Sequence, residues 1–346
     1  MRKLFFLILA FYSIANCYSQ LTVISFTNDT ISKSETFTEK EFYNNEINRW
    51  TKEIQNDNNN SNAYVNRGRI KQDSEDFDGA MQDYSTAIEI DPNDNFAYSS
   101  RAYLKSELKD FSGAIADHTK AIELSEELEP VRKADSYRNR GIAKSELKDY
   151  QGAISDFNKS IEFYPEFNVV YFDRGIAKSE LKDYQGAIAD FNKAINLDPN
   201  DSETYRNRGL AKRELEDYRG AIADFNKAIQ IDPNNTNAHK NRGYAKYSLQ
   251  DYRGAIADYT KALAITPSNG SYFLRGCAKY DLKDFQGAIL DFTKAIQLDI
   301  NDAGAYFNRG LAKIKLKQKN SGCLDFSKAG ELGYEDAYEA IKELCN

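Results

Sequence analysis

The sequence has few of the residues that most often carry out chemistry. It contains two histidines, one tryptophan and four cysteines among 346 residues, and no His, Cys and Asp residues have metal-site spacing. A glycine-rich phosphate loop and a Ser–His–Asp order typical of hydrolases are also missing. The sequence therefore argues against an enzyme, and predicts no cofactor, no metal ion and no small-molecule substrate.

Positive charge is also scarce. Lys and Arg number 46 against 53 Asp and Glu, which gives a net charge of −7. Non-specific nucleic-acid binding needs clustered positive charge to displace counterions, so we expect no nucleic-acid partner. Aromatic residues make up 13 % of the chain and only six prolines are present, which is too apolar for a disordered protein.

Long hydrophobic runs are limited to one, the 12 residues Leu4–Ala15, which follow two basic residues. A bilayer-spanning helix needs about 20 apolar residues, so this run better fits a secretory signal peptide. We expect cleavage after Ser19 and a protein that is exported, either periplasmic or extracellular. In a second interpretation Cys17 is lipidated and anchors the protein to a membrane. An uncleaved membrane anchor is a third.

The sequence does contain a pattern that recurs many times along the chain. The glycine of an Arg-Gly dipeptide recurs at positions 68, 141, 175, 209, 243, 276 and 310, and Ala102 fills one further slot. Successive spacings are 34, 39, 34, 34, 34, 33 and 34 residues. We number positions 1 to 34 within each repeat so that this glycine is at position 8. In the stretch Asn207 to Pro233 and its flank, the recurring residues are Tyr205, Gly209, Ala221, Phe225, Ala228 and Pro233.

This pattern resembles the tetratricopeptide repeat, a helix–turn–helix unit of 34 residues. The resemblance implies an all-α fold, a right-handed α-solenoid whose first helices line a concave side. Small residues at positions 8, 20 and 27 should let the two helices approach closely, with the aromatic residues filling the gaps. Because one hairpin cannot bury its own apolar faces, stability should come from stacking of neighbouring repeats.

The expected organisation follows from this spacing. After a signal peptide (1–19) and a flexible leader (20–38), a capping helix or half repeat covers 39–60, with Trp50 over the apolar edge of the first repeat. A short capping helix closes the chain at 335–346. Extra residues near 126–133 should form a longer second helix or a bulged loop. The eight repeats between the caps, 61–334, are 61–94, 95–128, 134–167, 168–201, 202–235, 236–268, 269–302 and 303–334.

Charges also recur with the repeat period. Arg occupies position 7 and Asp position 23 in all eight repeats, which predicts an Arg–Asp bridge with a structural role. Lys occupies position 11 in all eight, and we expect it to be a solvated or rim charge. Asp occupies position 16 in seven repeats, where it should cap the second helix.

The cysteines and histidines receive structural interpretations. Cys323 lies at position 21 and Cys345 in the final helix, and we predict a disulfide between them. Two buried thiols are the alternative. Cys277 should be a buried, inert thiol. His118 and His239 take the places of repeat aromatics, so both should lie at the edge of the core.

Position 6 gives the first part of a candidate binding site. It is Asn in five repeats, and some long arrays of the resembled family line their inner face with such asparagines, which hold the backbone of an extended peptide. An amide side chain offers both a donor and an acceptor to a peptide group. The alternative is a polar residue merely tolerated on a solvated face. The five residues are Asn66, Asn139, Asn207, Asn241 and Asn308.

Positions 5, 9 and 12 give the second part, because they vary between repeats. In the later repeats they form a basic and aromatic patch, whereas carboxylates at position 13 make the earlier wall acidic. We therefore expect a non-enzymatic scaffold that binds a protein or an extended peptide on the concave face. The alternative is a structural or adaptor component of a cell-envelope assembly that uses its outer face or ends. The patch residues are Arg206, Arg213, Lys240, Tyr244, Tyr247 and Tyr280.

Overall fold

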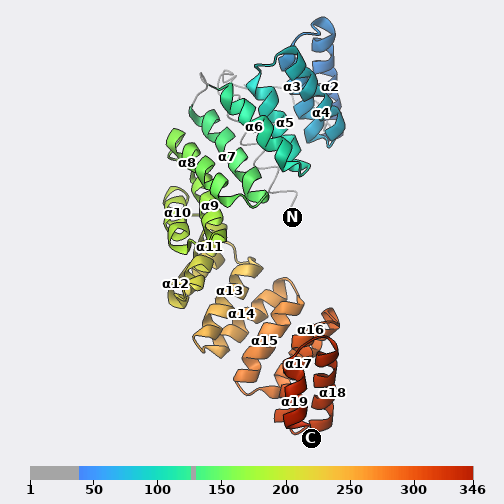
Figure 1. Cartoon of the computed structure of the whole chain (residues 1–346), viewed down its shortest axis with the longest axis vertical. Coiled ribbons are helices and arrows are strands. Elements are labelled where there is room, and N and C mark those ends of the chain that lie inside the picture. Colours follow the sequence, from blue (N-terminus) through green and yellow to red (C-terminus); the bar gives the residue numbers. More distant parts are fainter. Residues whose placement is uncertain (1–38, 126–129, 346) are drawn as a thin grey trace, which may run out of the picture. The chain divides into compact units, whose positions relative to one another are not determined.

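The computed structural model describes residues 39–125 and 130–345, and this part of the chain is a succession of helices (Figure 1). The expected signal peptide and leader lie outside the described residues. All eight repeats belong to one compact unit, Ile47–Asn346. The helices are α2 (Glu39–Asn56), α3 (Ser61–Asp73), α4 (Phe77–Ile90), α5 (Asn95–Glu107), α6 (Phe111–Glu123), α7 (Pro130–Glu146), α8 (Tyr150–Phe163), α9 (Asn168–Glu180), α10 (Tyr184–Leu197), α11 (Ser202–Glu214), α12 (Tyr218–Ile231), α13 (Thr236–Ser248), α14 (Tyr252–Ile265), α15 (Asn269–Asp281), α16 (Phe285–Leu298), α17 (Ala303–Lys315), α18 (Lys319–Glu331) and α19 (Asp336–Leu344).

The helices pair as hairpins that stack in chain order. Each odd-numbered helix from α3 to α17 packs against the helix that follows it, and each second helix packs against the first helix of the next repeat. Successive first helices also contact one another, from α3 with α5 to α15 with α17. The predicted all-α solenoid is confirmed, and its first helices form a continuous face, called here the first-helix face.

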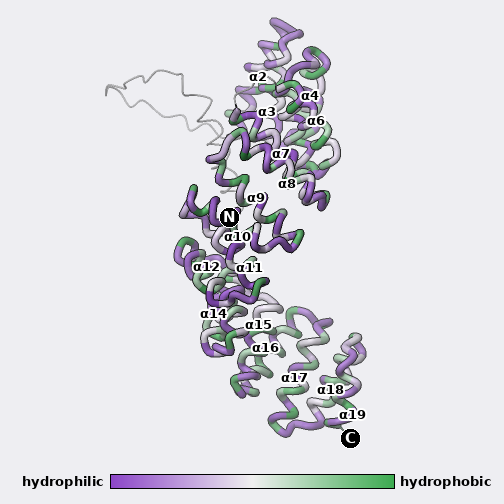
Figure 2. The backbone as a smooth tube through the Cα atoms, turned by 60° about the vertical axis from the view of Figure 1, so that its left-hand side comes forward, coloured by the Kyte–Doolittle hydropathy of each residue, from purple (hydrophilic) through white to green (hydrophobic). Residues whose placement is uncertain are grey.

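Hydrophilic and hydrophobic residues alternate along the helices, so one side of each can pack against its neighbours (Figure 2). In α12 the residues at positions 20, 24 and 27 are fully buried: Ala221, Phe225 and Ala228. Glycine at position 8 is required by close packing, because a Cβ on Gly209 would lie 2.7 Å from the Phe225 ring. The predicted roles of the small and aromatic positions are therefore confirmed.

The aspartates at position 16 cap the second helices, as predicted. In α12 the Asp217 carboxylate accepts a hydrogen bond from the Gly220 amide at 2.9 Å, and the other six repeats with this Asp repeat the contact. A Cβ on Gly220 would collide with that carboxylate, which explains the glycine at position 19. Gln318 makes no such contact, so α18 begins without a side-chain cap.

The residue before each capping position has an unusual backbone. Position 15 has φ between 60° and 67° in all eight repeats, although none of the eight residues is glycine. Such left-handed backbone is disfavoured for residues with a Cβ, by roughly 1–2 kcal/mol. The sharp turn between the paired helices therefore carries a small strain in every repeat.

Of the two expectations for the extra residues after the second repeat, the longer second helix is contradicted, and the bulged loop stays a prediction. The second helix of that repeat, α6, keeps an ordinary length and ends at Glu123, whereas α7 is 17 residues long instead of 13. Pro130 starts α7. An amide hydrogen at this position would have no hydrogen-bond acceptor within the helix, so proline can take the place. The expectation of a longer second helix was wrong, because proline begins the following helix instead. Residues 126–129 lie outside the described part.

The C-terminal helix α19 packs on α18, as expected of a cap. Cys323 and Cys345, the predicted pair, form a disulfide with their Cα atoms 5.9 Å apart. The buried side of α19 consists of Ala337 and Ala340. Tyr338 remains 63 % exposed, although its hydroxyl donates to the Gly330 carbonyl at 3.1 Å.

Candidate functional site

The repeated charges form a three-residue cluster within each hairpin. In the fifth repeat, the Arg208 Nε and Nη2 atoms donate to the two oxygens of Asp224 at 3.0 and 2.5 Å. Arg208 lies four residues before Lys212, so both face the same way, and the Lys212 ammonium lies 2.8 Å from Asp224. The Asp224 side chain is only 4 % exposed, so two cations compensate for its burial.

The cluster recurs in all eight repeats, so the predicted Arg–Asp bridge is confirmed. The expectation that Lys at position 11 is a solvated or rim charge was wrong: these side chains are 15–23 % exposed and each pairs with the buried Asp. The eight lysines are Lys71, Lys105, Lys144, Lys178, Lys212, Lys246, Lys279 and Lys313.

Each arginine also connects its repeat to the preceding one. The Arg208 Nη1 atom donates to the Asn192 side-chain oxygen at 2.6 Å, across the boundary between repeats four and five. Sequence reasoning missed this contact, although position 25 is Ser, Thr or Asn in every repeat. The arginines and lysines of these clusters are thus engaged in contacts within and between the repeats. The acceptors in chain order are Thr51, Ser85, Thr119, Asn158, Asn192, Asn226, Thr260 and Thr293.

The asparagines at position 6 all lie in first helices, but their amides are already engaged. Asn66, Asn207 and Asn308 each donate to the backbone carbonyl four residues earlier, at 2.8–2.9 Å. Asn139 donates to Asp135, while Asn241 is buried and accepts from Arg213 at 3.5 Å. The structure therefore does not hold them as a uniform row of free amides. At Asn207 and Asn308 one amide hydrogen is used, and the side-chain oxygen accepts no hydrogen bond from the described residues.

Part of the basic and aromatic patch is brought together between repeats five and six. The Arg213 guanidinium lies 5.2 Å from the centre of the Tyr244 ring and pairs with Glu214 at 2.6 Å. Tyr244 is 40 % exposed. Stacking of this kind holds a planar cation and an aromatic ring in one orientation. The first-helix face therefore presents an ordered, partly exposed aromatic group here.

The other patch residues make contacts elsewhere and do not join the Arg213–Tyr244 pair. Arg206 pairs with Glu203 at 2.7 Å, so it is largely neutralised. The Tyr247 hydroxyl donates to Asp281 in the next repeat, and desolvation followed by that contact raises the Tyr247 pKa. The Tyr280 ring packs edge-on against Phe285 at 5.2 Å. Of these three contacts, the one from Tyr247 to Asp281 joins neighbouring repeats, and the other two lie within a single repeat.

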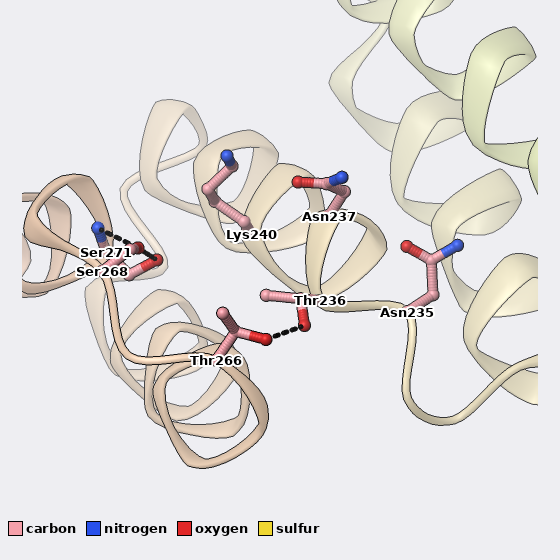
Figure 3. Close-up of a pocket in the computed structure, with 7 residues that line it drawn as sticks. All are labelled: Asn235, Thr236, Asn237, Lys240, Thr266, Ser268 and Ser271. Carbon is pink, nitrogen blue, oxygen red and sulfur yellow. Dashed lines mark hydrogen bonds between the residues drawn. The ribbon is translucent and has the colours of Figure 1, made fainter. Parts of the chain in front are cut away.

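Lys240 differs from the other basic residues of the patch, because it forms no ion pair within the described residues. It lies at the edge of an open pocket of about 440 Å³ where α13 and α15 begin (Figure 3). Hydroxyl and amide groups make up the rest of the lining, and Thr236 and Thr266 hydrogen-bond across it at 3.3 Å. The lining residues are Asn235, Thr236, Asn237, Lys240, Thr266, Ser268 and Ser271.

The earlier part of the first-helix face is acidic, as expected, and partly cross-linked. Arg138 of repeat three donates to Asp173 of repeat four at 2.7 Å. Burial raises the Asp173 pKa, while Arg138 opposes that shift. Position 13 adds exposed carboxylates, namely Glu107, Glu146, Glu180 and Glu214.

The remaining reactive side chains belong to the core. His118 is fully buried, and burial lowers its pKa to about 4. The buried His239 ring contacts the Pro233 carbonyl at 3.1 Å. Cys277 is partly buried against the core, not fully buried as expected, and this burial raises its pKa to about 12, so its thiol is unreactive at neutral pH. Across residues 39–125 and 130–345, no group of acidic, His or Cys side chains could hold a metal ion, and no helix is long and apolar enough to cross a membrane.

A stack of helical hairpins with uniform internal clusters and a variable first-helix face is the architecture of an interaction module. Sequence-family models support this class. Models described as tetratricopeptide repeats match residues 61–94, 134–167, 236–269 and 270–301, and a TPR repeat model matches 178–212 and 209–250. These matches cover more than half of the chain, which belongs to the tetratricopeptide repeat family.

Two solved structures with TM-scores above 0.5 show the same fold, and a third is similar over part of its length. A tetratricopeptide repeat protein from Parabacteroides merdae is 20 % identical, with a TM-score of 0.54, over 73 % of this chain and 99 % of that one. The Cut9–Hcn1 assembly of APC/C is 16 % identical, with a TM-score of 0.51, over 89 % of this chain and 60 % of that one. YrrB, described as a TPR protein with an unusual peptide-binding site, is 19 % identical, with a TM-score of 0.48, over 56 % of this chain and 96 % of that one. A search of curated protein sequences finds no match.

Proposed function

We propose that this protein is a non-enzymatic scaffold that binds an extended peptide or a protein segment on its first-helix face, centred on α11, α13 and α15. The tetratricopeptide repeats support the broader role of a protein–protein interaction scaffold. The finer assignment rests on one observation. Tyr244 is exposed beside Arg213, and the unpaired Lys240 lies one turn away on the same helix.

This combination suits a peptide. The exposed Tyr244 ring offers apolar area with little conformational freedom to lose, and aromatic residues of this kind dominate binding energy at interfaces. Lys240 can pair with a carboxylate of the peptide, and the hydroxyl-lined pocket beside it can hydrate or bind polar groups. The Asn207 oxygen can accept a peptide N–H bond, worth about 0.5–1.5 kcal/mol.

The test uses a photo-crosslinking amino acid in place of Tyr244 in the full chain, incubated with an extract that contains the partner. Adducts are expected with the probe at 244. A probe at Ala116, on the exposed side of the second helix α6, should give none. Equal labelling from both positions would contradict a binding site on the first-helix face.

Affinity for the identified partner then provides the quantitative check. Tyr244→Ala combined with Lys240→Ala should weaken binding at least tenfold and leave thermal unfolding unchanged, because both side chains project outward. Tyr103→Ala is a matched control, since Tyr103 occupies the same repeat position and is 54 % exposed. Equal losses in both variants, or none, would overturn the placement. For a test of the position-6 asparagines, Asn207→Ala is the more suitable substitution, because Asn241 is buried against Arg213.

We also propose that the protein acts after export. The N-terminal apolar run supports this, and so does the Cys323–Cys345 disulfide, since such bonds persist mainly in oxidising compartments. Mass spectrometry of the mature protein tests the proposal. An N-terminus at Gln20 is expected, whereas a lipidated Cys17 would show membrane attachment and an intact Met1 would contradict cleavage.

A further inference from the structure

The second helices carry a row of lysines on the side that faces away from the first helices. Position 26 is Lys in seven repeats. In three of these the ammonium pairs with a glutamate three residues later, at 2.8–3.4 Å. Those pairs are Lys120–Glu123, Lys159–Glu162 and Lys328–Glu331.

In repeats four to seven the glutamate is missing. Position 29 there is Asn196, Gln230, Ala264 or Gln297. Lys227 and Lys294 donate only to the neutral amides of Gln230 and Gln297, at 3.2 and 3.0 Å. Lys193 and Lys261 form no ion pair or hydrogen bond within the described residues.

Two arginines extend this row. Arg219 and Arg253 lie at position 18, two turns earlier on the same side of α12 and α14, and both are exposed. Neither forms an ion pair in the described part of the chain. The carboxylates of Asp217 and Asp251 lie nearby but cap the helix amides. We call the six cations the basic ridge: Lys193, Arg219, Lys227, Arg253, Lys261 and Lys294.

No carboxylate on these four helices can neutralise the ridge. The one aspartate within each helix, at position 23, is buried and already paired with the Arg and Lys of its own hairpin. The ridge therefore concentrates unpaired positive charge in a chain whose net charge is −7. In three other repeats a glutamate neutralises the lysine at position 26, so the missing glutamates distinguish these four helices from the second helices of those repeats.

The chemistry around the ridge favours one class of anion. Between the cations at position 22 are small residues, Ala189, Ala223 and Ala257, before Leu290. The aromatic rings of position 24 are fully buried and those of position 17 are only partly exposed, so these four helices offer no fully exposed ring to stack on nucleic-acid bases. Membrane-surface helices use Trp, Phe or Leu to enter the lipid. Here only α14 and α16 expose large apolar side chains, none of them aromatic, and α10 and α12 expose none. These side chains are Ile265, Leu290 and Leu298.

We propose that the basic ridge is a second interaction surface, which binds an acidic segment of a protein partner across α10, α12, α14 and α16. The second helices do not pack directly on one another, so their lysines are spaced by at least about 10 Å. Carboxylates on every seventh residue of a helix repeat at about that distance. This surface is separate from the first-helix face, and binding to one does not depend on the other.

Poly-L-glutamate is the probe, with fluorescence anisotropy of the labelled polymer as the readout. The full chain should bind it at low ionic strength and release it as salt screens the charges. The triple variant Lys193→Gln, Lys261→Gln, Lys294→Gln should bind about tenfold more weakly. The matched variant Lys120→Gln, Lys159→Gln, Lys328→Gln loses the same charge from paired lysines and should bind within twofold of the unchanged chain.

Equal weakening by the two triple variants would overturn the proposal, because net charge alone would then explain binding. Stronger binding to phosphatidylglycerol vesicles or to a single-stranded oligonucleotide than to poly-L-glutamate would also overturn it. Circular dichroism should show both variants folded, since all six substituted residues are on the surface. Tyr244→Ala should leave poly-L-glutamate binding unchanged, which separates this proposal from the one for the first-helix face.

Discussion

The pairing of Ala102 with His118 leads to a double-mutant prediction. In the other seven repeats position 8 is glycine, and a Cβ there would lie 2.6–2.8 Å from the aromatic ring at position 24. The second repeat has Ala102 at position 8 opposite the smaller imidazole of His118. Both His118 ring nitrogens are buried without a hydrogen-bond partner. In this hairpin the Ala102 methyl group fills the space that a larger ring takes up in the other repeats. The His118 ring keeps two polar atoms without a hydrogen bond.

The magnitudes follow from those contacts. His118→Phe alone removes the unpaired nitrogens, a gain of about 2 kcal/mol, but drives the ring into Ala102, a loss of about 2 kcal/mol. Ala102→Gly alone costs about 1 kcal/mol of helix propensity. The double variant keeps the gain without the collision, so it should be about 1 kcal/mol more stable than the natural chain. The coupling between the two sites is then about 2 kcal/mol.

The double variant should also change the pH dependence. Burial, opposed by Asp117 and Asp156 and assisted by Arg140, lowers the His118 pKa from 6.5 to about 4. Below pH 6.5 the His118 imidazole therefore binds a proton in the unfolded chain but not in the folded chain, and the free energy of unfolding falls until about pH 4. At pH 5.0 this amounts to about 2 kcal/mol relative to pH 7.5. Both variants that carry the His118→Phe substitution should lack this loss.

Urea unfolding of the four proteins at pH 7.5 and 5.0 is the assay. Additive effects of the two substitutions, or an unaltered difference between the two pH values, would refute the reasoning. The reciprocal exchange, Gly209→Ala with Phe225→His, is the control in the fifth repeat. It should introduce an acid-sensitive loss where none exists now.

Three further outcomes are expected. Asp224→Asn leaves Arg208 and Lys212 without a carboxylate and should cost about 3 kcal/mol of unfolding free energy, measured in urea; a loss below about 1 kcal/mol would show that the cluster is not a buried ion pair. Lys182→Gly should raise the melting temperature, with a gain of about 1 kcal/mol, because φ is 62° at Lys182, whereas Lys182→Ala should give no gain. Cys345→Ser should remove about 3 kcal/mol and speed amide exchange in α19 but not in α12; unchanged exchange in α19 would mean that the disulfide does not hold the cap.

Much of the frame could be predicted because each signal was repeated. The aspartates of position 16, the Arg–Asp bridge and the small residues at positions 8, 20 and 27 are periodic, and the periodicity itself specifies the helix face. The third member of the cluster, exemplified by Lys212, was misjudged as a rim charge. Its spacing of four residues from Arg208 held the needed signal, but the reach of its side chain to Asp224 is a three-dimensional fact.

The candidate site could be predicted less well. The sequence places Asn241 and Asn207 at the same repeat position, yet one is buried against Arg213 and the other is half-exposed, because their neighbours differ. The same holds for the aromatic patch, where Tyr247 is occupied by Asp281 and Tyr244 remains exposed. Variable positions depend on variable neighbours, so a repeat pattern gives no information about which of them are free.

The contact from each arginine to the preceding repeat has a consequence for how such an array can change in length. Every repeat carries one donor for the unit before it and one acceptor for the unit after it. The corresponding residue of the last repeat, Ser327, receives no arginine from a following repeat, and its hydroxyl donates to the Cys323 carbonyl at 3.0 Å. Duplication of a 34-residue block in the interior would therefore reproduce every link at both new boundaries. Growth beyond the last repeat would instead have to displace α19 and its disulfide, so the chain can gain units within the array more easily than at its end.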